Sequence, residues 1–95
     1  MSEVSGDVVA EVRVTFKLFA MLQDYLPVEA RRDNALALDV PDGTTVLQII
    51  ERFSVPLKSC HLVLIDGNYV PPTERGTRIL KDGETLAIWP PIAGG

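Results

Sequence analysis

The sequence predicts an α+β domain in which one amphipathic helix covers a single mixed or mainly antiparallel sheet. Three observations lead to this class. Several short apolar stretches have the two-residue period of strands, one segment has the period of an amphipathic helix, and strands are expected on both sides of that segment. The 95 residues, 46% of them hydrophobic and 23% charged, suffice for one such domain.

The first half of the chain predicts two strands joined by a short helix. Apolar and polar residues alternate over 12–18, which is typical of a strand with one buried face. The next apolar residues have the spacing of one helical face, at Leu18, Leu22, Tyr25 and Leu26. Pro27 is expected to end this short helix. A second strand is expected at 36–40, before the turn residues Pro41-Asp42-Gly43. Residues 1–10 lack a clean period and are expected to form a flexible N-terminal segment.

The main helix is predicted to begin after Thr45. Thr45 and Gln48 have the spacing of a capping box, in which each side chain accepts a hydrogen bond from a free backbone N–H group. One apolar stripe follows, made of Val46, Ile49, Ile50 and Phe53. Val55-Pro56 is expected to close the helix.

The second half of the chain predicts three further strands. Residues Leu62–Ile65 are continuously apolar, which favours an interior strand covered on both faces. Asp66-Gly67 should turn the chain into a short strand at 68–70, and residues 71–80 should form a long connection. The turn Lys81-Asp82-Gly83 then leads into the last strand at Thr85–Trp89. One main helix and four to five short strands within residues 11–90 are the inventory of a β-grasp domain, followed by a flexible segment at 91–95.

Composition argues against several function classes. The net charge of −4 does not favour a nucleic-acid binder, and no apolar run is long enough to span a membrane. The acidic residues 1–7 are unlike a signal peptide, so a cytoplasmic location is expected. One cysteine, Cys60, and one histidine, His61, cannot complete a zinc site, and as strand neighbours they should point apart rather than form a nucleophile pair. No metal, bound cofactor or catalytic residue is expected.

The C-terminal sequence is the most informative part of the chain. It reads Trp89-Pro90-Pro91-Ile92-Ala93-Gly94-Gly95. A diglycine can be a frayed end or a cloning remnant, but here two prolines would stiffen it into an arm. Glycines without Cβ atoms can pass through a narrow channel, so the arm could deliver the Gly95 carboxylate to a partner. Such a carboxylate needs activation, for instance adenylation, before it takes up sulfur or acylates an amine.

Residues 12–95 resemble the MoaD/ThiS family of ubiquitin-like sulfur carriers. The resemblance rests on Pro90-Pro91-Ile92-Ala93-Gly94-Gly95, on the preceding turn Lys81-Asp82-Gly83-Glu84, and on Pro41-Asp42-Gly43-Thr44-Thr45-Val46 before the main helix. It implies a β-grasp fold and a carrier that is not itself an enzyme. The implied working species is a thiocarboxylate on Gly95, and Gly94, Ala93, Ile92, Pro91 and Pro90 would form the segment that inserts into a partner.

Within this family, two features favour the MoaD type, the small subunit of molybdopterin synthase. One is the tail, and the other is the room for an extra helix at residues 19–34. The stretch from Asp66 to Leu80 is more similar to ThiS. The resemblance implies three partners: an ATP-using adenylyltransferase of the MoeB or ThiF type, a MoaE-type large subunit or another sulfur acceptor, and a sulfur donor such as a cysteine desulfurase or rhodanese.

Three alternatives remain open at this point. The chain could serve thiamin thiazole synthesis or another sulfur-transfer pathway, it could be a modifier whose Gly95 is joined to lysines, or it could be a non-catalytic β-grasp interaction module. Trp89, close to the root of the tail, is the first candidate for a partner surface. It could equally be an aromatic residue that covers the core.

Overall fold

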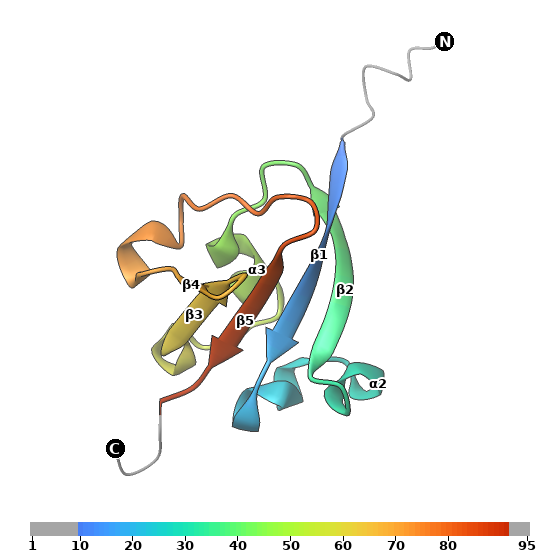
Figure 1. Cartoon of the computed structure of the whole chain (residues 1–95). Coiled ribbons are helices and arrows are strands. Elements are labelled where there is room, and N and C mark those ends of the chain that lie inside the picture. The colour runs from blue at the N-terminus through green and yellow to red at the C-terminus, as the bar shows by residue number, and fades with distance from the viewer. Residues whose placement is uncertain (1–9, 92–95) are drawn as a thin grey trace.

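A five-stranded sheet with one main helix on one face organises the chain (Figure 1). The structure is a computed structural model that describes residues 10–91. The strand order is β2-β1-β5-β3-β4, and only β1 and β5 run parallel, so the sheet is mixed as predicted. The strands are β1 (Glu11–Leu18), β2 (Ala35–Pro41), β3 (Leu62–Ile65), β4 (Asn68–Tyr69) and β5 (Thr85–Trp89).

The main helix, α3 (Val46–Arg52), begins where the capping box predicted. The Gln48 backbone N–H donates to Thr45 Oγ1 at 3.2 Å, and the Thr45 backbone N–H donates to Gln48 Oε1 at 2.9 Å. Both bonds satisfy donors that the first turn of a helix leaves free. The other helical elements are α2 (Val28–Arg31) and three 3₁₀ helices, η1 (Ala20–Tyr25), η2 (Leu57–Ser59) and η3 (Pro72–Glu74).

The segment after β1 differs from the single short helix that was predicted. It forms η1, and Pro27 then acts as the N-cap of α2 rather than as the end of all helical structure. Proline is compatible with a helix start because its missing N–H is not needed there. Leu22 and Leu26 are buried as their spacing indicated, whereas Tyr25 is 39% exposed.

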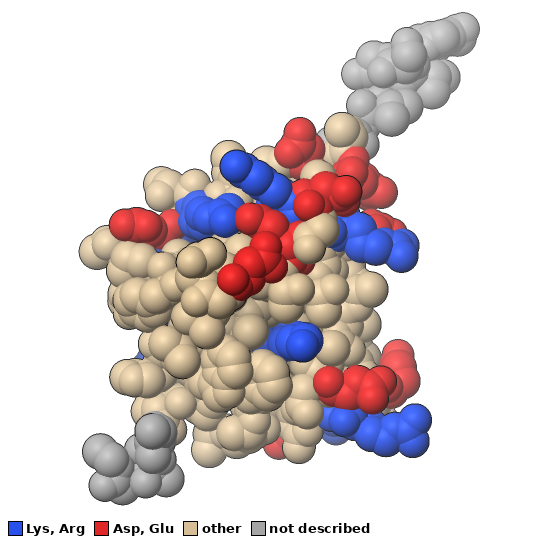
Figure 2. Space-filling model, viewed as in Figure 1, with Lys and Arg blue, Asp and Glu red and all other residues tan. Residues whose placement is uncertain are grey.

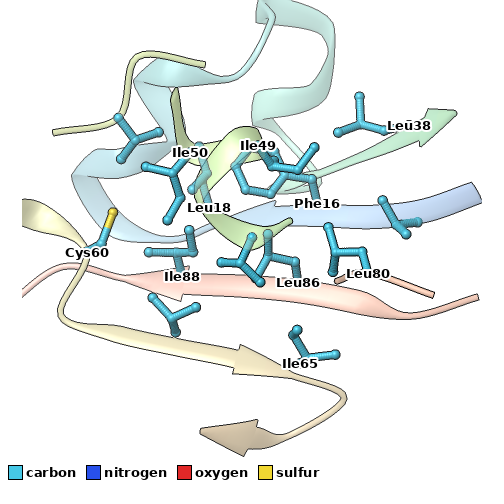
Figure 3. Packing of buried hydrophobic residues seen from close by; sticks show 14 of the residues in the cluster. Phe16, Leu18, Leu38, Ile49, Ile50, Cys60, Ile65, Leu80, Leu86 and Ile88 are labelled. Atoms are coloured by element: carbon cyan, nitrogen blue, oxygen red, sulfur yellow. The ribbon is translucent and has the colours of Figure 1, made fainter. Parts of the chain in front are cut away.

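The hydrophobic core lies between α3 and one face of the sheet (Figure 3). The α3 stripe meets alternate residues of the central strands, and the Phe16 and Phe53 rings pack with centroids 5.0 Å apart. Because successive side chains of a strand point to opposite faces, Leu86 and Ile88 of β5 both point toward α3, and both are completely buried. The fully buried side chains include Phe16, Leu18, Ile49, Ile50, Ile65, Leu80, Leu86 and Ile88.

Strand β3 is not covered on both faces, so that prediction was wrong. Val63 and Ile65 are buried, while Leu62 is exposed and Leu64 is half-buried. The apolar run therefore has the burial pattern of a strand with one open face. The connection after β4 is also more ordered than predicted, since it contains η3 and a β-bridge between Ile79 and Thr45. The turn into β5 agrees with its sequence, with Gly83 at a φ of 87°.

Candidate functional site

The residues predicted to carry the chemistry fall in two groups. Ile92, Ala93, Gly94 and Gly95 lie outside the described residues. Pro90 is half-buried and Pro91 is exposed, and both follow β5 directly. The structure therefore defines the root of the C-terminal segment and the surface around it.

The end of β5 is held from both sides. The Phe19 backbone N–H donates to the Ile88 carbonyl at 3.1 Å, and the His61 backbone N–H donates to the Trp89 carbonyl at 3.0 Å. The first bond comes from the chain after β1 and the second from the residue before β3. Because β5 lies between those two strands, its last residues have hydrogen-bonding neighbours on each side. The point at which the chain leaves the sheet is thus fixed.

Trp89 lies on the sheet face that α3 does not cover. Its ring stacks on that of Phe19, with centroids 4.3 Å apart and an angle of 8° between the planes. Trp89 is half-buried by this contact. It does not cover the main core, because its neighbour Ile88 points to the helix side and successive strand residues alternate. A partner-binding role for Trp89 stays a prediction, but the stack places a flat aromatic surface at the root of the tail.

The uncovered face, here called the open face, is apolar around Trp89. The strand register places Leu62 beside Trp89, Leu64 beside Ala87, and Tyr69 beside Leu64. Leu62 is 36% exposed and Tyr69 is 54% exposed. Figure 2 shows this side of the molecule as a broad uncharged area with one basic group inside it. The register places Lys17 next to Ala87, within this area.

The opposite end of the open face is charged. Arg13 binds Asp39 through two bonds of 2.8 and 2.9 Å, and the Arg13 backbone N–H donates to Asp82 at 2.7 Å. The hydrogen bond from Arg13 lowers the pKa of the Asp39 carboxyl group. In Figure 2 many charged side chains gather at this upper end, and a second group lies at the lower right, away from the grey C-terminal residues at the lower left. The apolar region around Trp89 and the charged region around Arg13 therefore have different chemistry, although both lie on one face.

Cys60 and His61 do not form a reactive pair. Cys60 is buried and His61 is exposed, in line with the predicted divergence, although both precede β3 rather than lie in it. Burial raises the pKa of the Cys60 thiol, and the positive charge of Arg75 offsets this only in part. The thiol contacts the Pro56 carbonyl at 3.5 Å. A protonated, buried thiol is a poor nucleophile.

Arg75 is a buried charge that the sequence did not reveal. It is 5% exposed, and its Nε and Nη1 groups donate to the carbonyls of Val70 and Cys60 at 3.2 and 2.9 Å. These bonds join the chain after β4 to the chain before β3. Its Nη2 atom has no partner among residues 10–91, and Arg75 lines a cavity of about 280 Å³. Arg75 therefore links two loops through these hydrogen bonds.

Among the described residues, no group of three or more His, Cys, Asp or Glu side chains is placed to hold a metal ion. No helix in the same part of the chain is long and apolar enough to cross a membrane.

A comparison with known protein families identifies the family of this chain. The model of the Mut7-C ubiquitin family matches residues 11–93. The chain belongs to the Mut7-C ubiquitin family. The match spans all five strands and α3, and it confirms the ubiquitin-like assignment made from the sequence motifs. A search of curated proteins found no significant match.

Solved structures share the fold of this Mut7-C ubiquitin domain. The HVO 2177 protein of Haloferax volcanii aligns with a TM-score of 0.65 at 19% identity, covering 90% of this chain and 88% of that chain. A Pyrococcus furiosus protein whose proposed identity is molybdopterin converting factor, subunit 1, aligns with a TM-score of 0.60 at 23% identity, covering 85% and 99%. The small archaeal modifier protein 1 (SAMP1) of Methanosarcina acetivorans aligns with a TM-score of 0.59 at 25% identity, covering 90% and 99%. These neighbours confirm the β-grasp prediction.

Sequence reasoning missed most of the open face. Leu62 and Leu64 were assigned to a doubly covered strand, and Phe19 was not paired with Trp89. One signal could have exposed the first error: the sequence predicts only one main helix, which can cover only one face of the sheet, so a strand covered on both faces was not expected. Nothing local in the sequence indicates the Phe19–Trp89 stack, because the two residues are far apart in the chain.

Proposed function

We propose that this domain is a sulfur carrier whose Gly95 carboxylate is adenylated by a partner enzyme, converted to a thiocarboxylate and used as a sulfur donor in molybdopterin synthesis. The domain itself holds no cofactor in this proposal, and the ATP is bound and used by the partner. Its role is to be recognised through the open face and to present the C-terminal segment.

The observation that carries the proposal is the fixed root of the tail beside an apolar surface. Two backbone hydrogen bonds hold Ile88 and Trp89, and Pro90 and Pro91 follow at once. A proline-stiffened segment loses less conformational entropy on insertion into a partner, where each flexible residue costs about 1–2 kcal/mol. An apolar face next to the root gives that partner a surface to bind.

The partner and this chain would contribute different groups to the reaction. Attack of the Gly95 carboxylate on the α-phosphorus of ATP would expel pyrophosphate and leave an acyl adenylate. Attack by the terminal sulfur of a donor persulfide on the acyl carbon would then expel AMP and form an acyl disulfide. A thiol of the partner or donor would cleave this S–S bond, forming a disulfide with the donor sulfur and releasing the Gly95 thiocarboxylate. No side chain of the domain takes part in any of these steps, so the partner must supply the acid–base and phosphate-binding groups. The adenylating partner would be of the MoeB or ThiF type, and the sulfur would come from a cysteine desulfurase or rhodanese.

Support for the molybdopterin pathway comes from fold likeness to the P. furiosus protein and from the tail sequence. The receiving enzyme would be a MoaE-type large subunit. Gly94 and Gly95 could pass through a narrow entry to its active site, because residues without a Cβ atom allow close backbone approach.

Intact-protein mass spectrometry of the chain from its native host tests the carrier proposal. We expect the mass to increase by the replacement of one oxygen with one sulfur, and fragmentation to place the change at Gly95 as the last residue. A chain in which Gly95 is replaced by the larger Trp, incubated with ATP, a sulfur donor and host extract, is the matched control and should stay unmodified. An unmodified native chain under the same incubation would contradict the proposal.

A second candidate function is protein modification, in which Gly95 is joined to lysines through the same acyl adenylate. The specific support is the 25% identity with the M. acetivorans SAMP1, over 99% of that chain. Branched peptides that link Gly95 to a lysine side chain would establish this use. Their absence, together with a thiocarboxylate, would leave the carrier function alone.

A further inference from the structure

Strand β2 presents a long free edge. Its neighbour β1 pairs in an unbroken antiparallel register from Glu11–Pro41 to Lys17–Ala35. Just beyond the two ends of this ladder, the Leu18 N–H donates to the Asn34 carbonyl and the Asp42 N–H to the Ala10 carbonyl. Since bonded and non-bonded pairs alternate in an antiparallel ladder, the even-numbered residues of β2 bond to β1. The N–H and C=O groups of Ala35, Ala37 and Asp39 therefore point away from the sheet.

Most of this edge lacks the features by which proteins usually protect an edge strand, although α2 packs near its first residues. It has no bulge, no lysine, and its proline stands only at the last position, Pro41. Its one charged side chain, Asp39, is drawn toward β1 by two bonds to Arg13. The other edge of the sheet, β4, has only two residues. In Figure 1, β2 forms the outer side of the sheet, with α2 near its first residues.

We propose that β2 pairs with β2 of a second copy of this chain, antiparallel and centred on Ala37, to form a continuous ten-stranded sheet. In this register Ala37 faces Ala37 of the second copy, and Ala35 faces Asp39. It is the register in which all three outward-pointing residues of each strand form bonded pairs, so every free donor and acceptor between Ala35 and Asp39 is satisfied.

The charged residues near the two ends of β2 support a second copy of the chain as the partner at this edge. Antiparallel pairing brings the start of one β2 next to the end of the other. Arg32 comes shortly before the strand, and Asp42 follows its last residue. Arg31 donates to two backbone carbonyl groups and Asp39 is paired with Arg13, so these two charges are already partnered. The proposed register brings Arg32 of each copy toward Asp42 of the other, twice in a symmetric pair.

Side chains at the proposed contact also fit. On the open face the residues nearest the two-fold axis are Ala35 and Ala37, whose small side chains leave room for close strand approach. On the helix side, Leu36 would lie opposite Leu38 of the second copy. Leu36 is only partly buried in the single chain, so the pairing would cover apolar surface that α3 leaves exposed.

The pairing would keep the functional surfaces free. A two-fold axis perpendicular to the sheet puts both open faces on the same side of the ten-stranded sheet. Trp89 lies in β5, which is separated from β2 by β1, so the root of each tail stays outside the contact. Two copies would then present two tails at once. Assembly through β2 does not depend on the sulfur chemistry.

Light scattering coupled to size-exclusion chromatography, over a range of protein concentrations, tests the pairing. We expect the full chain to give a concentration-dependent dimer. Ala37→Lys and Ala37→Glu each place like charges opposite each other on the two-fold axis, so each variant alone should be a monomer. An equimolar mixture of the two should regain the dimer, because Lys then faces Glu.

Tyr69→Lys is the matched control, since it adds the same charge at the opposite edge of the sheet, and it should remain dimeric. Circular dichroism of the Ala37 variants checks that each one is folded. Rescue in the mixture would itself show that neither variant is misfolded. A monomeric wild-type chain at all concentrations would overturn the proposal. So would a dimer that both Ala37 variants retain, because residue 37 would then lie away from the two-fold axis.

Discussion

The two faces of the sheet are formed by the same strands but have different roles. Ile88 points to α3 and is fully buried, whereas Trp89, the next residue, stacks on Phe19 at the open face. On β3, Val63 is buried and Leu62 is exposed in the same way. The helix-side face therefore determines stability, and the open face keeps apolar side chains that the fold does not need to bury. Surplus apolar surface of this kind is typical of a binding site.

The largest loss of stability is expected from a substitution on the helix-side face. Ile88→Ala should lower the free energy of unfolding by about 2–5 kcal/mol, since it removes buried methyl groups and leaves a cavity between α3 and β5. Urea denaturation measures this loss. Leu62→Ala is the matched control on the open face, and we expect a smaller loss of about 1 kcal/mol, because Leu62 is already 36% exposed. Equal losses for the two variants would show that the open face is covered in solution.

A smaller effect is expected from the aromatic stack at the open face. Stacked rings contribute about 0.5–1.5 kcal/mol beyond the area they bury. A double-mutant cycle with Phe19→Leu, Trp89→Leu and the double variant should therefore give a coupling energy of about 1 kcal/mol. Additive losses would mean that the rings do not interact in solution. Both single variants keep an apolar side chain, so the main core remains unchanged.

Loss of the stack should also affect the proposed function more than stability. If a partner binds the surface beside the tail, Trp89→Leu should slow formation of the thiocarboxylate, whereas Ile88→Val, a mild core change, should not. Rates are compared at a temperature at which both variants are folded. This contrast separates a role in recognition from a general loss of structure.

Much of the fold was predictable because local signals agree with the final structure. The capping box at Thr45 fixed the start of α3, and the turn at Gly83 fixed the start of β5. The two-residue period identified β1 and β2. These features depend on backbone geometry within a few residues, so the sequence alone contains them.

What the sequence could not predict depends on residues far apart in the chain. The continuous apolar run of β3 is compatible with one or two covered faces, and only the packing of α3 decides between them. The Phe19–Trp89 stack and the Arg75 contacts with Val70 and Cys60 likewise require the tertiary fold. For the candidate site, the roles of the tail and of Trp89 stay predictions, and the sequence did not reveal the apolar surface around Trp89. The role of Gly95 stays a prediction.

The smallest effect concerns the charged region around the turn before β5. Burial raises the pKa of Glu84, but the hydrogen bonds from Arg78 and from the Lys81 backbone N–H outweigh it and hold that pKa below the ordinary value of 4.5. A lowered pKa means that ionised Glu84 stabilises the folded state above pH 4.5. This contribution is lost as the pH falls through the lower pKa of the folded protein.

Glu84→Gln can keep one acceptor oxygen for the Lys81 N–H and Arg78 Nη1, but it removes the charge and replaces Oε2, which accepts from Arg78 Nη2, with a donor NH2 group. We expect the variant to be less stable than the wild type by up to about 1 kcal/mol at neutral pH, as for a partly exposed ion pair. The difference should shrink as the pH is lowered below 4.5, because the wild-type carboxyl group then becomes neutral too. Thermal unfolding of both proteins across this range measures the effect. Asp39 titrates in both proteins, so a stability difference that stays constant with pH would rule out a contribution from the Glu84 charge.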